Sequence, residues 1–526
     1  MLRSVEHDRN SLTVYAAMAG SETARTAKNA LLGTYIILCC LSLLPFVAIA
    51  QPPIVDFANH AARLTLACSS ADPDVAAMYQ YRLGIIPNLA VDLVNQPLCG
   101  IIAPNMVLRL VTALSLSLIY ISGWTIQRKL SGRANAFVLL LPAIAFNLVT
   151  TMGYINFLAG VAGACLLVSF AIGPQERFGR LFLLCNLGGI VIFFCHIFAL
   201  GFVLLVFFGF MLGSERVTAQ RIGGALWRTA ALFVAPLLLI AFVPPSHEPF
   251  SIGFWHKSRS LFALFMAQHI SLGAYGIALL AVLYLLLRNK FVDVEKGMRT
   301  PLLALGGFVL VCPSSIRDAV DVDSRLLVAL GYLFFASLTV RRRDREISLA
   351  VASVAAALVA FQLWSTVTIW VPFSNRVDEL RRMSVVLPSR AKVFTVASDG
   401  PERLAQPLAY SHVSSYLTIQ RHVFNPLEFT GVGMQPLSVT STYASIDTPT
   451  GQPYSPQLAN RFIAPDPALT KLAVENEARF ALYWPRNFDY VLFYHFGRAR
   501  NFNPKVLHEV ARGSFFSIFR VNKAGT

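Results

Sequence analysis

A dense run of polar residues follows the first long apolar segment of the chain. Asp56, Asn59, His60 and Arg63 come shortly after the apolar run 31–50. Their spacing of three, four and seven residues would place all four on one face of a helix. Asp56 could cap that helix or pair with Arg63, but ionised groups so close to a membrane are costly and indicate function by default. We therefore take Asp56 as a candidate functional carboxylate.

Further polar residues lie near the ends of later apolar segments. Arg325 could clamp a phosphate, because its guanidinium offers fixed bidentate geometry, or it could simply anchor the span that follows it. His60 and His196 could belong to a site or be satisfied interfacial histidines, and the pair His247-Glu248 could be loop surface or site. The candidate substrate-binding residues are Asn59, His60, Arg63, Asp92, Asn156, His196, His247, Glu248, Asp323 and Arg325.

Two carboxylates close in sequence, Asp321 and Asp323, could bind a divalent cation through hard oxygen ligands. Two carboxylates alone are a weak metal signal, so no cofactor is predicted with certainty and a divalent cation stays open. The sequence has no zinc motif, phosphate-binding glycine loop or nucleophile elbow.

A membrane-embedded scaffold must position these residues. Of the 526 residues, 55% are hydrophobic and 14% are charged, and the mean hydropathy of +0.58 is too high for a soluble protein. A spanning helix needs about 20 apolar residues, and we predict about eleven such spans, the first of them a retained helix rather than a cleavable signal. The expected spans are 31–50, 106–126, 134–151, 153–172, 181–195, 197–213, 229–243, 271–287, 301–312, 326–340 and 347–370.

The basic residues of the connecting loops predict the orientation. Cytoplasmic loops collect Lys and Arg, and most basic loop residues fall inside if the N-terminus is cytoplasmic. This bias also accounts for the net charge of +16, so we expect no nucleic-acid partner. The outside loops would hold only Arg63, Arg82, Lys257, Arg259, Arg317 and Arg325.

The remainder of the chain, 372–526, is polar and would lie outside after an odd number of spans. At roughly 150 residues it can hold its own core. We predict two parts: a multi-span membrane domain, 1–371, with a long first outside loop, 51–104, and a small extracytoplasmic α/β domain, 372–526. Strands are expected at 391–398, 490–494, 505–510 and 515–521, the last two as a hairpin, and a helix at 467–480.

Six of the eight cysteines lie in or at the ends of expected spans. Only Cys68 and Cys99 fall within the first outside loop. If that face is a periplasm, these two residues could form a disulfide, and the alternative is a pair of buried free thiols.

Short motifs in the membrane region resemble the GT-C superfamily of polyprenyl-phosphate-sugar-dependent membrane glycosyltransferases, in particular a poorly characterised bacterial branch. An Asp soon after the first span, a long first outside loop, many further spans and an outside α/β domain are similar to that superfamily. The motifs are DFANHAAR (56–63), PNLAVD (87–92), GYINF (153–157), HIF (196–198) and DSRL (323–326).

The resemblance implies a glycosyltransferase of the bacterial inner membrane and cell envelope. It would move a sugar from a polyprenyl-phosphate donor, beside membrane lipid, to a glycan, lipid or protein acceptor on the outer face. Asp56 would be the general base, and Arg325, Arg63 or His196 would stabilise the leaving phosphate. Many members have paired acidic residues in the first loop, whereas Asp56 is followed by Phe57, so Asp92 could substitute for the second carboxylate.

Two other classes of function stay open. A transporter or flippase for a lipid-linked or polar substrate should carry ionisable or helix-breaking residues near the middle of its spans. The expected spans are nearly free of ionisable residues at their centres, which favours chemistry at the interface. A non-catalytic envelope assembly protein, with an outside domain that binds a partner, is the third reading.

Overall fold

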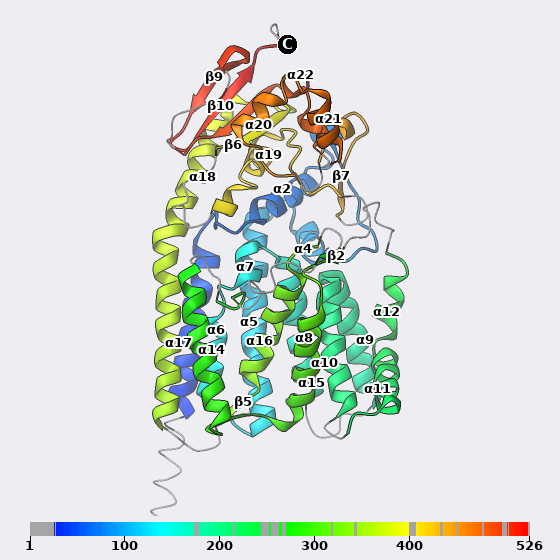
Figure 1. The fold of residues 1–526 in the computed structure, drawn as a ribbon, viewed down its shortest axis with the longest axis vertical. Helices are drawn as coiled ribbons and strands as arrows, with labels where there is room; N and C mark the ends of the chain where they lie inside the picture. Colours follow the sequence, from blue (N-terminus) through cyan, green and yellow to red (C-terminus); the bar gives the residue numbers. More distant parts are fainter. Residues whose placement is uncertain are drawn as a thin grey trace, which may run out of the picture.

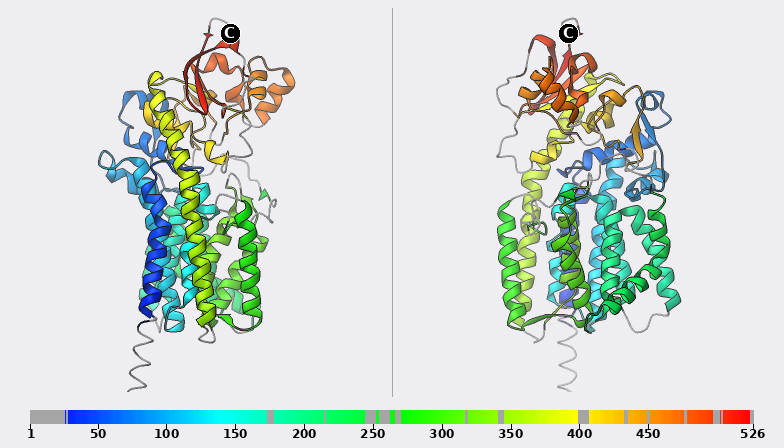
Figure 2. Two further views of the ribbon diagram at one scale, coloured as in Figure 1. Left: turned by 90° about the vertical axis from the view of Figure 1, so that its left-hand side faces the viewer. Right: turned by 45° about the vertical axis from the view of Figure 1, so that its right-hand side comes forward.

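The computed structural model is a long helical bundle with a mixed helix-and-strand cap at one end (Figure 1). The N-terminal end of the first helix and the cap lie at opposite ends of the bundle (Figure 2). The structure describes residues 26, 28–172, 178–213, 216–243, 252–253, 262–265, 270–316, 319–340, 345–398, 407–431, 435–448, 451–475, 478–496, 502 and 504–523.

Every expected span coincides with helical structure in the bundle. The third is broken into short pieces, η2 (Ala136–Leu139), α6 (Leu140–Ala143) and α7 (Leu148–Met152). The others are Lys28–Ala48, α5 (Pro104–Ser131), α8 (Ile155–Ala171), α9 (Phe178–Cys195), α10 (Ile197–Leu212), α11 (Ala219–Leu232) with α12 (Val234–Ile240), α14 (Ile270–Arg288), α15 (Lys296–Val311), α16 (Val322–Ala336) and α17 (Arg345–Ser365).

Several of these helices suit a membrane by length and composition. Among the described residues, Lys28–Ala48, Pro104–Ser131, Phe178–Cys195 and Glu346–Val386 could each cross one, and the pair α11–α12, bent by 84°, could add a fifth crossing. Shorter apolar helices pack beside them. The chain is therefore a helical membrane protein, and the count of eleven spans stays a prediction.

Close helix packing builds the bundle core. A Cβ atom on Gly209 of α10 would lie 2.3 Å from Cα of Pro301 in α15. Only a residue without a side chain allows the two helices to approach this closely.

The last long helix continues past the expected boundary at 371. A π-helical turn, Thr366–Trp370, joins α17 to α18 (Val371–Met383), and the helical stretch extends to Val386. The polar sequence after Trp370 therefore changes the environment of the helix, not its conformation, and Val377 and Leu380 pack into the cap. Figure 2 shows this helix running the length of the molecule into the cap.

The cap contains a four-stranded sheet in the order β6 (Val393–Ala397), β8 (Tyr490–Tyr494), β10 (Phe516–Val521), β9 (Leu507–Arg512). β6 and β8 are parallel, and the other pairs are antiparallel. The four expected strands and their hairpin are confirmed. The expected helix at 467–480 is α21 (Pro467–Glu475) followed by a short 3-10 turn, and the cap also holds α19 (Ser415–Arg421), α20 (Pro456–Arg461) and α22 (Trp484–Asn487).

The loop 51–104, which is predicted to lie outside, is part of the cap. Its helix α2 (Phe57–Cys68) packs against α19, and its strand β1 (Tyr79–Tyr81) pairs antiparallel with β7 (Leu437–Val439). The loop also contains α3 (Pro73–Met78) and α4 (Ala90–Asn95).

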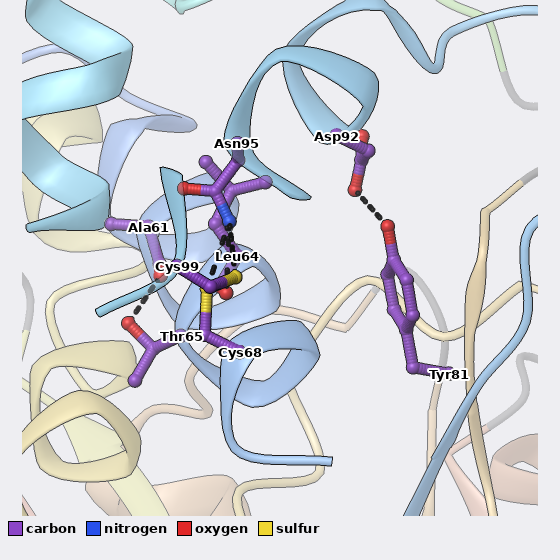
Figure 3. The surroundings of a disulfide bond; sticks show 8 residues. All are labelled: Ala61, Leu64, Thr65, Cys68, Tyr81, Asp92, Asn95 and Cys99. Carbon is purple, nitrogen blue, oxygen red and sulfur yellow. Dashed lines mark hydrogen bonds between the residues drawn. A yellow bond between two sulfur atoms is a disulfide. The ribbon is translucent and has the colours of Figure 1, made fainter. Parts of the chain in front are cut away.

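A disulfide joins Cys68, at the end of α2, to Cys99, just after α4 (Figure 3). The prediction of a disulfide is confirmed over that of two free thiols. Asn95 donates a hydrogen bond to Sγ of Cys68 at 3.1 Å, which fixes α4 beside α2.

Candidate functional site

Asp56 lies where the cap meets the bundle. It precedes the first residue of α2, and its backbone N–H donates to the carbonyl of Met152 at the end of α7. Gly153 has a left-handed φ of +87°, and a Cβ there would lie 3.1 Å from Cβ of Asp56. The glycine therefore lets the turn between α7 and α8 fit against Asp56.

His412, just before α19, approaches Asp56 from the C-terminal part of the cap. Its Nε2 lies 3.7 Å from Oδ1 of Asp56. The Asn59 amide nitrogen lies 3.4 Å from Nδ1 of His412. Because an amide nitrogen only donates, Nδ1 accepts, and a neutral ring then carries its proton on Nε2, towards Asp56.

The surroundings of Asp56 suit proton transfer near neutral pH. Burial raises the pKa of Asp56 to about 7; the positive charges of Arg325 and Arg63 oppose this rise, and the negative charge of Asp321 adds to it. Burial lowers the pKa of His412 to about 4, so the ring is neutral near pH 7. The Asp56 side chain keeps 17% of its surface exposed, which leaves it within reach of a ligand.

Arg325, in the first turns of α16, makes no ion pair or hydrogen bond with a carboxylate in the described part of the chain, although its charge acts on Asp56. Its guanidinium lies over the Tyr154 ring, 3.4 Å from the ring centroid, and its buried Nε has no hydrogen-bond partner among the described residues. Such a group is costly to bury unpaired. An anionic ligand would supply the missing acceptor.

The contact between Arg325 and His196 supports the same conclusion. Nη1 of Arg325 lies 3.3 Å from Nε2 of His196, and Nδ1 of His196 accepts the backbone N–H of Phe198. A neutral imidazole with an accepting Nδ1 carries its proton on Nε2. Two donors therefore face each other, and a ligand oxygen could accept from both.

Asp321 and Tyr154 complete this group of residues. The Tyr154 hydroxyl donates to Oδ2 of Asp321 at 3.0 Å, and the Asp321 carbonyl accepts the backbone N–H of Arg325. Asp321 has a left-handed φ of 57°, which costs a non-glycine residue on the order of 1–3 kcal/mol and persists only where the surrounding structure enforces it. Among the described residues, no cluster of three or more potential metal ligands occurs.

Other predicted site residues make internal contacts. Arg63 and Asp92 form a bidentate ion pair with both side chains fully buried, and Arg63 also contacts Gln435. Tyr81 donates to Asp92 at 3.3 Å (Figure 3). This network joins α2, α4 and the C-terminal part of the cap, and it leaves Arg63 and Asp92 behind the surface that a substrate would meet.

The remaining predicted residues are also part of the framework. Asn156 binds the backbone of Asn88 and Val91, and Asn59 binds the backbone of Leu427 and Phe429.

Asp323 accepts from the hydroxyl of Ser314 and the backbone N–H of Ser324. His60 is buried with its ring against Phe429. His247 and Glu248 lie outside the described residues.

Three members of the group were absent from the predicted set of site residues. The sequence predicts Asp321 only as a possible metal ligand, and Tyr154 only as part of the motif GYINF. His412 stands in a segment of ordinary composition far along the chain from Asp56, and no local signal marks it. A search for polar residues near apolar segments therefore could not find it.

No family model matches the chain, and no curated protein matches it. Among solved structures, the chain is similar to the crystal structure of ArnT from Cupriavidus metallidurans in the apo state. The identity is 13%, the alignment covers 96% of this chain and 99% of that chain, and the TM-score is 0.49. Similarity at this level does not by itself assign a function.

Proposed function

We propose that this protein is an integral-membrane glycosyltransferase that moves a sugar from a polyprenyl-phosphate donor to an acceptor at the junction of bundle and cap. The observation that carries the proposal is that a possible base and a possible phosphate-binding group occur together at this junction. A half-buried carboxylate, Asp56, has a pKa of about 7, and a buried guanidinium, Arg325, makes no ion pair and leaves its Nε without a hydrogen bond among the described residues.

The reaction follows from these two groups. The acceptor hydroxyl attacks the anomeric carbon of the donor, and Asp56 takes its proton. The bond from the anomeric carbon to the phosphate oxygen breaks, and the phosphate leaves with the electron pair. Arg325 and the Nε2–H of His196 stabilise the charge that develops on the leaving group.

His412 acts as a positioning residue in this proposal. Its Nε2–H faces the Asp56 carboxylate, and Asn59 holds the ring in that tautomer. A neutral donor in this position orients the carboxylate, and it does not neutralise the charge that a base needs.

The place of the site supports a lipid-linked donor. The first outside loop exposes the apolar side chains of Ile85, Leu93, Val94 and Ile101, and a membrane surface would cover such a patch. The disulfide in the same loop favours an oxidising compartment and hence the outer face of the membrane. The N-terminus would then be cytoplasmic.

The direct test uses the full-length protein in lipid vesicles with a panel of polyprenyl monophosphates, each carrying one sugar, and a mixed acceptor extract. Released polyprenyl phosphate is measured by thin-layer chromatography. We expect release with at least one donor and a loss of about 100- to 10,000-fold in Asp56→Asn. Release that Asp56→Asn leaves unchanged rejects Asp56 as the base, and no release with any donor rejects the proposed donor class.

A further inference from the structure

A groove of about 770 Å³ opens on the cap, away from Asp56. It lies at the C-terminal end of β10, the part of the cap farthest from the helical bundle (Figure 1). Its size falls within the range of small-ligand sites. The lining residues used here are Arg390, Asp489, Tyr490, His508, Arg520 and Lys523.

Three residues near one end of the sheet, one from each of three neighbouring strands, form one wall of the groove. Arg520 of β10 is directly opposite Tyr490 of β8 and His508 of β9. Directly opposed residues project from the same face of a sheet. Farther along that face, Leu492 and Ile518 belong to a buried core, whereas Arg520 and His508 are exposed. Arg520 and His508 are therefore accessible on this face of the sheet, next to the part that the core covers.

The charges of the groove are mostly positive. Asp489 is already engaged, because its carboxylate accepts from Nζ of Lys523 at 2.6 Å and from the backbone N–H of Lys392 at 3.0 Å. The side chains of Arg390 and Arg520 make no hydrogen bond or ion pair within the described part of the chain. Two guanidinium groups in the groove are thus open to an anion.

The backbone holds Arg390 in an unusual conformation. Its φ is 62°, in the left-handed region, and its N–H donates to the carbonyl of His422 at 3.0 Å. A left-handed arginine is disfavoured and persists only where the surrounding structure enforces it. The turn 388–391 therefore has a fixed shape at the side of the groove.

These groups have a common chemistry. Guanidinium forks bind phosphate or carboxylate oxygens in pairs. The half-buried ring of Tyr490 offers a flat apolar face with a polar tip, which suits the C–H face of a sugar ring and its hydroxyls. A membrane headgroup would supply similar anions, but the groove lies at the end of the molecule away from the bundle.

We propose that this groove binds a saccharide that carries a phosphate or carboxylate group, through Arg390, Arg520 and Tyr490. Identification of that saccharide as part of the acceptor rests on the proposed function. Binding itself does not depend on catalysis.

The test measures binding to the full-length protein in nanodiscs by titration calorimetry. The probes are maltotriose monophosphate, maltotriose and inorganic phosphate. We expect maltotriose monophosphate to bind at least 10-fold more tightly than either other probe. Arg390→Ala, Arg520→Ala and Tyr490→Ala should each weaken that binding by about 10-fold.

Arg479→Ala is the matched control, since Arg479 is an exposed arginine of the same cap that does not line the groove. It should bind like wild type. Equal loss in Arg479→Ala, or full binding in the Arg390 and Arg520 variants, overturns the proposal. Inorganic phosphate that binds as tightly as the phosphorylated trisaccharide also overturns it, because the sugar then contributes nothing.

Asp56→Asn separates this inference from the proposed function. It should bind maltotriose monophosphate like wild type. Loss of turnover in Asp56→Asn, together with unchanged binding in the groove variants, rejects the groove alone. Groove variants that lose binding while Asp56→Asn stays fully active reject the catalytic proposal alone.

Discussion

Nε2 of His412 lies 3.7 Å from Oδ1 of Asp56, although one residue belongs to the C-terminal part of the cap and the other to the first outside loop. Correct packing of the cap is therefore a condition for the geometry of the proposed base. The sequence marks Asp56 as a candidate, because it follows a long apolar run, but it gives no local signal for His412.

Removal of His412 should shift the pH dependence of transfer. Without the Nε2–H donor, the Asp56 carboxylate loses a stabilising contact, so its pKa should rise and the acid limb of the profile should move to higher pH. A shift of one pH unit makes His412→Ala about 10-fold slower below the midpoint. His412→Gln, which keeps an N–H donor, should restore part of the difference. Lower activity with an unmoved midpoint would indicate a purely structural role.

The wild-type pH profile reports Asp56 directly. Burial raises the pKa of this carboxyl to about 7, and a general base acts only when deprotonated. The value of kcat/KM should therefore rise with pH, reach half its plateau at about pH 7 and stay high above it. Initial rates of polyprenyl phosphate release in a constant-ionic-strength buffer series measure this. A profile that falls as pH rises through 7 is incompatible with the assignment.

Arg325 should act on the phosphate of the donor. Arg325→Ala removes the guanidinium that would hold the leaving group, and we expect a loss of about 100- to 1,000-fold in kcat/KM. Arg325→Lys keeps the positive charge but not the bidentate guanidinium, so its kcat/KM should lie between those of wild type and Arg325→Ala. Arg228→Ala, at an exposed arginine of α11, is the control and should transfer normally. If Arg325→Ala keeps wild-type donor kinetics, the phosphate lies elsewhere.

The ion pair of Arg63 and Asp92 should matter for stability. Arg63→Ala leaves the Asp92 carboxylate buried without its partner, which costs about 3–5 kcal/mol. A clearly lowered melting temperature in detergent is the expected result. The double variant Arg63→Met with Asp92→Leu removes both charges and should recover much of the loss. A fully stable, inactive Arg63→Ala would instead favour direct contact with substrate.

Sequence patterns predicted elements that carry their own signal. Apolar runs located the helices of the bundle, and the spacing of the polar residues after the first run predicted a helix, α2. That helix contains Asn59, His60 and Arg63, whereas Asp56 precedes its first residue. Strand β8 was predicted to the residue because it is a compact apolar run, and β10 because it follows the turn at Arg512-Gly513 as the second strand of a hairpin.

Elements that depend on distant partners could not be predicted this way. β1 and β7 are three residues each and pair across more than 350 residues of sequence, so neither carries a local signal. The full burial of Arg63 depends on Asp92 and Gln435 from other segments. The expected boundary at 371 missed the continuation of the last long helix into α18. A helix that leaves the membrane becomes polar in sequence while its backbone stays helical.

The most direct test of the central claim compares turnover and donor binding in Asp56→Asn. Amide for carboxylate keeps the size of the side chain and removes the base. The account predicts a kcat at least about 100-fold lower than wild type, with donor affinity unchanged because Arg325 holds the phosphate. Wild-type kcat in a folded Asp56→Asn protein would contradict it.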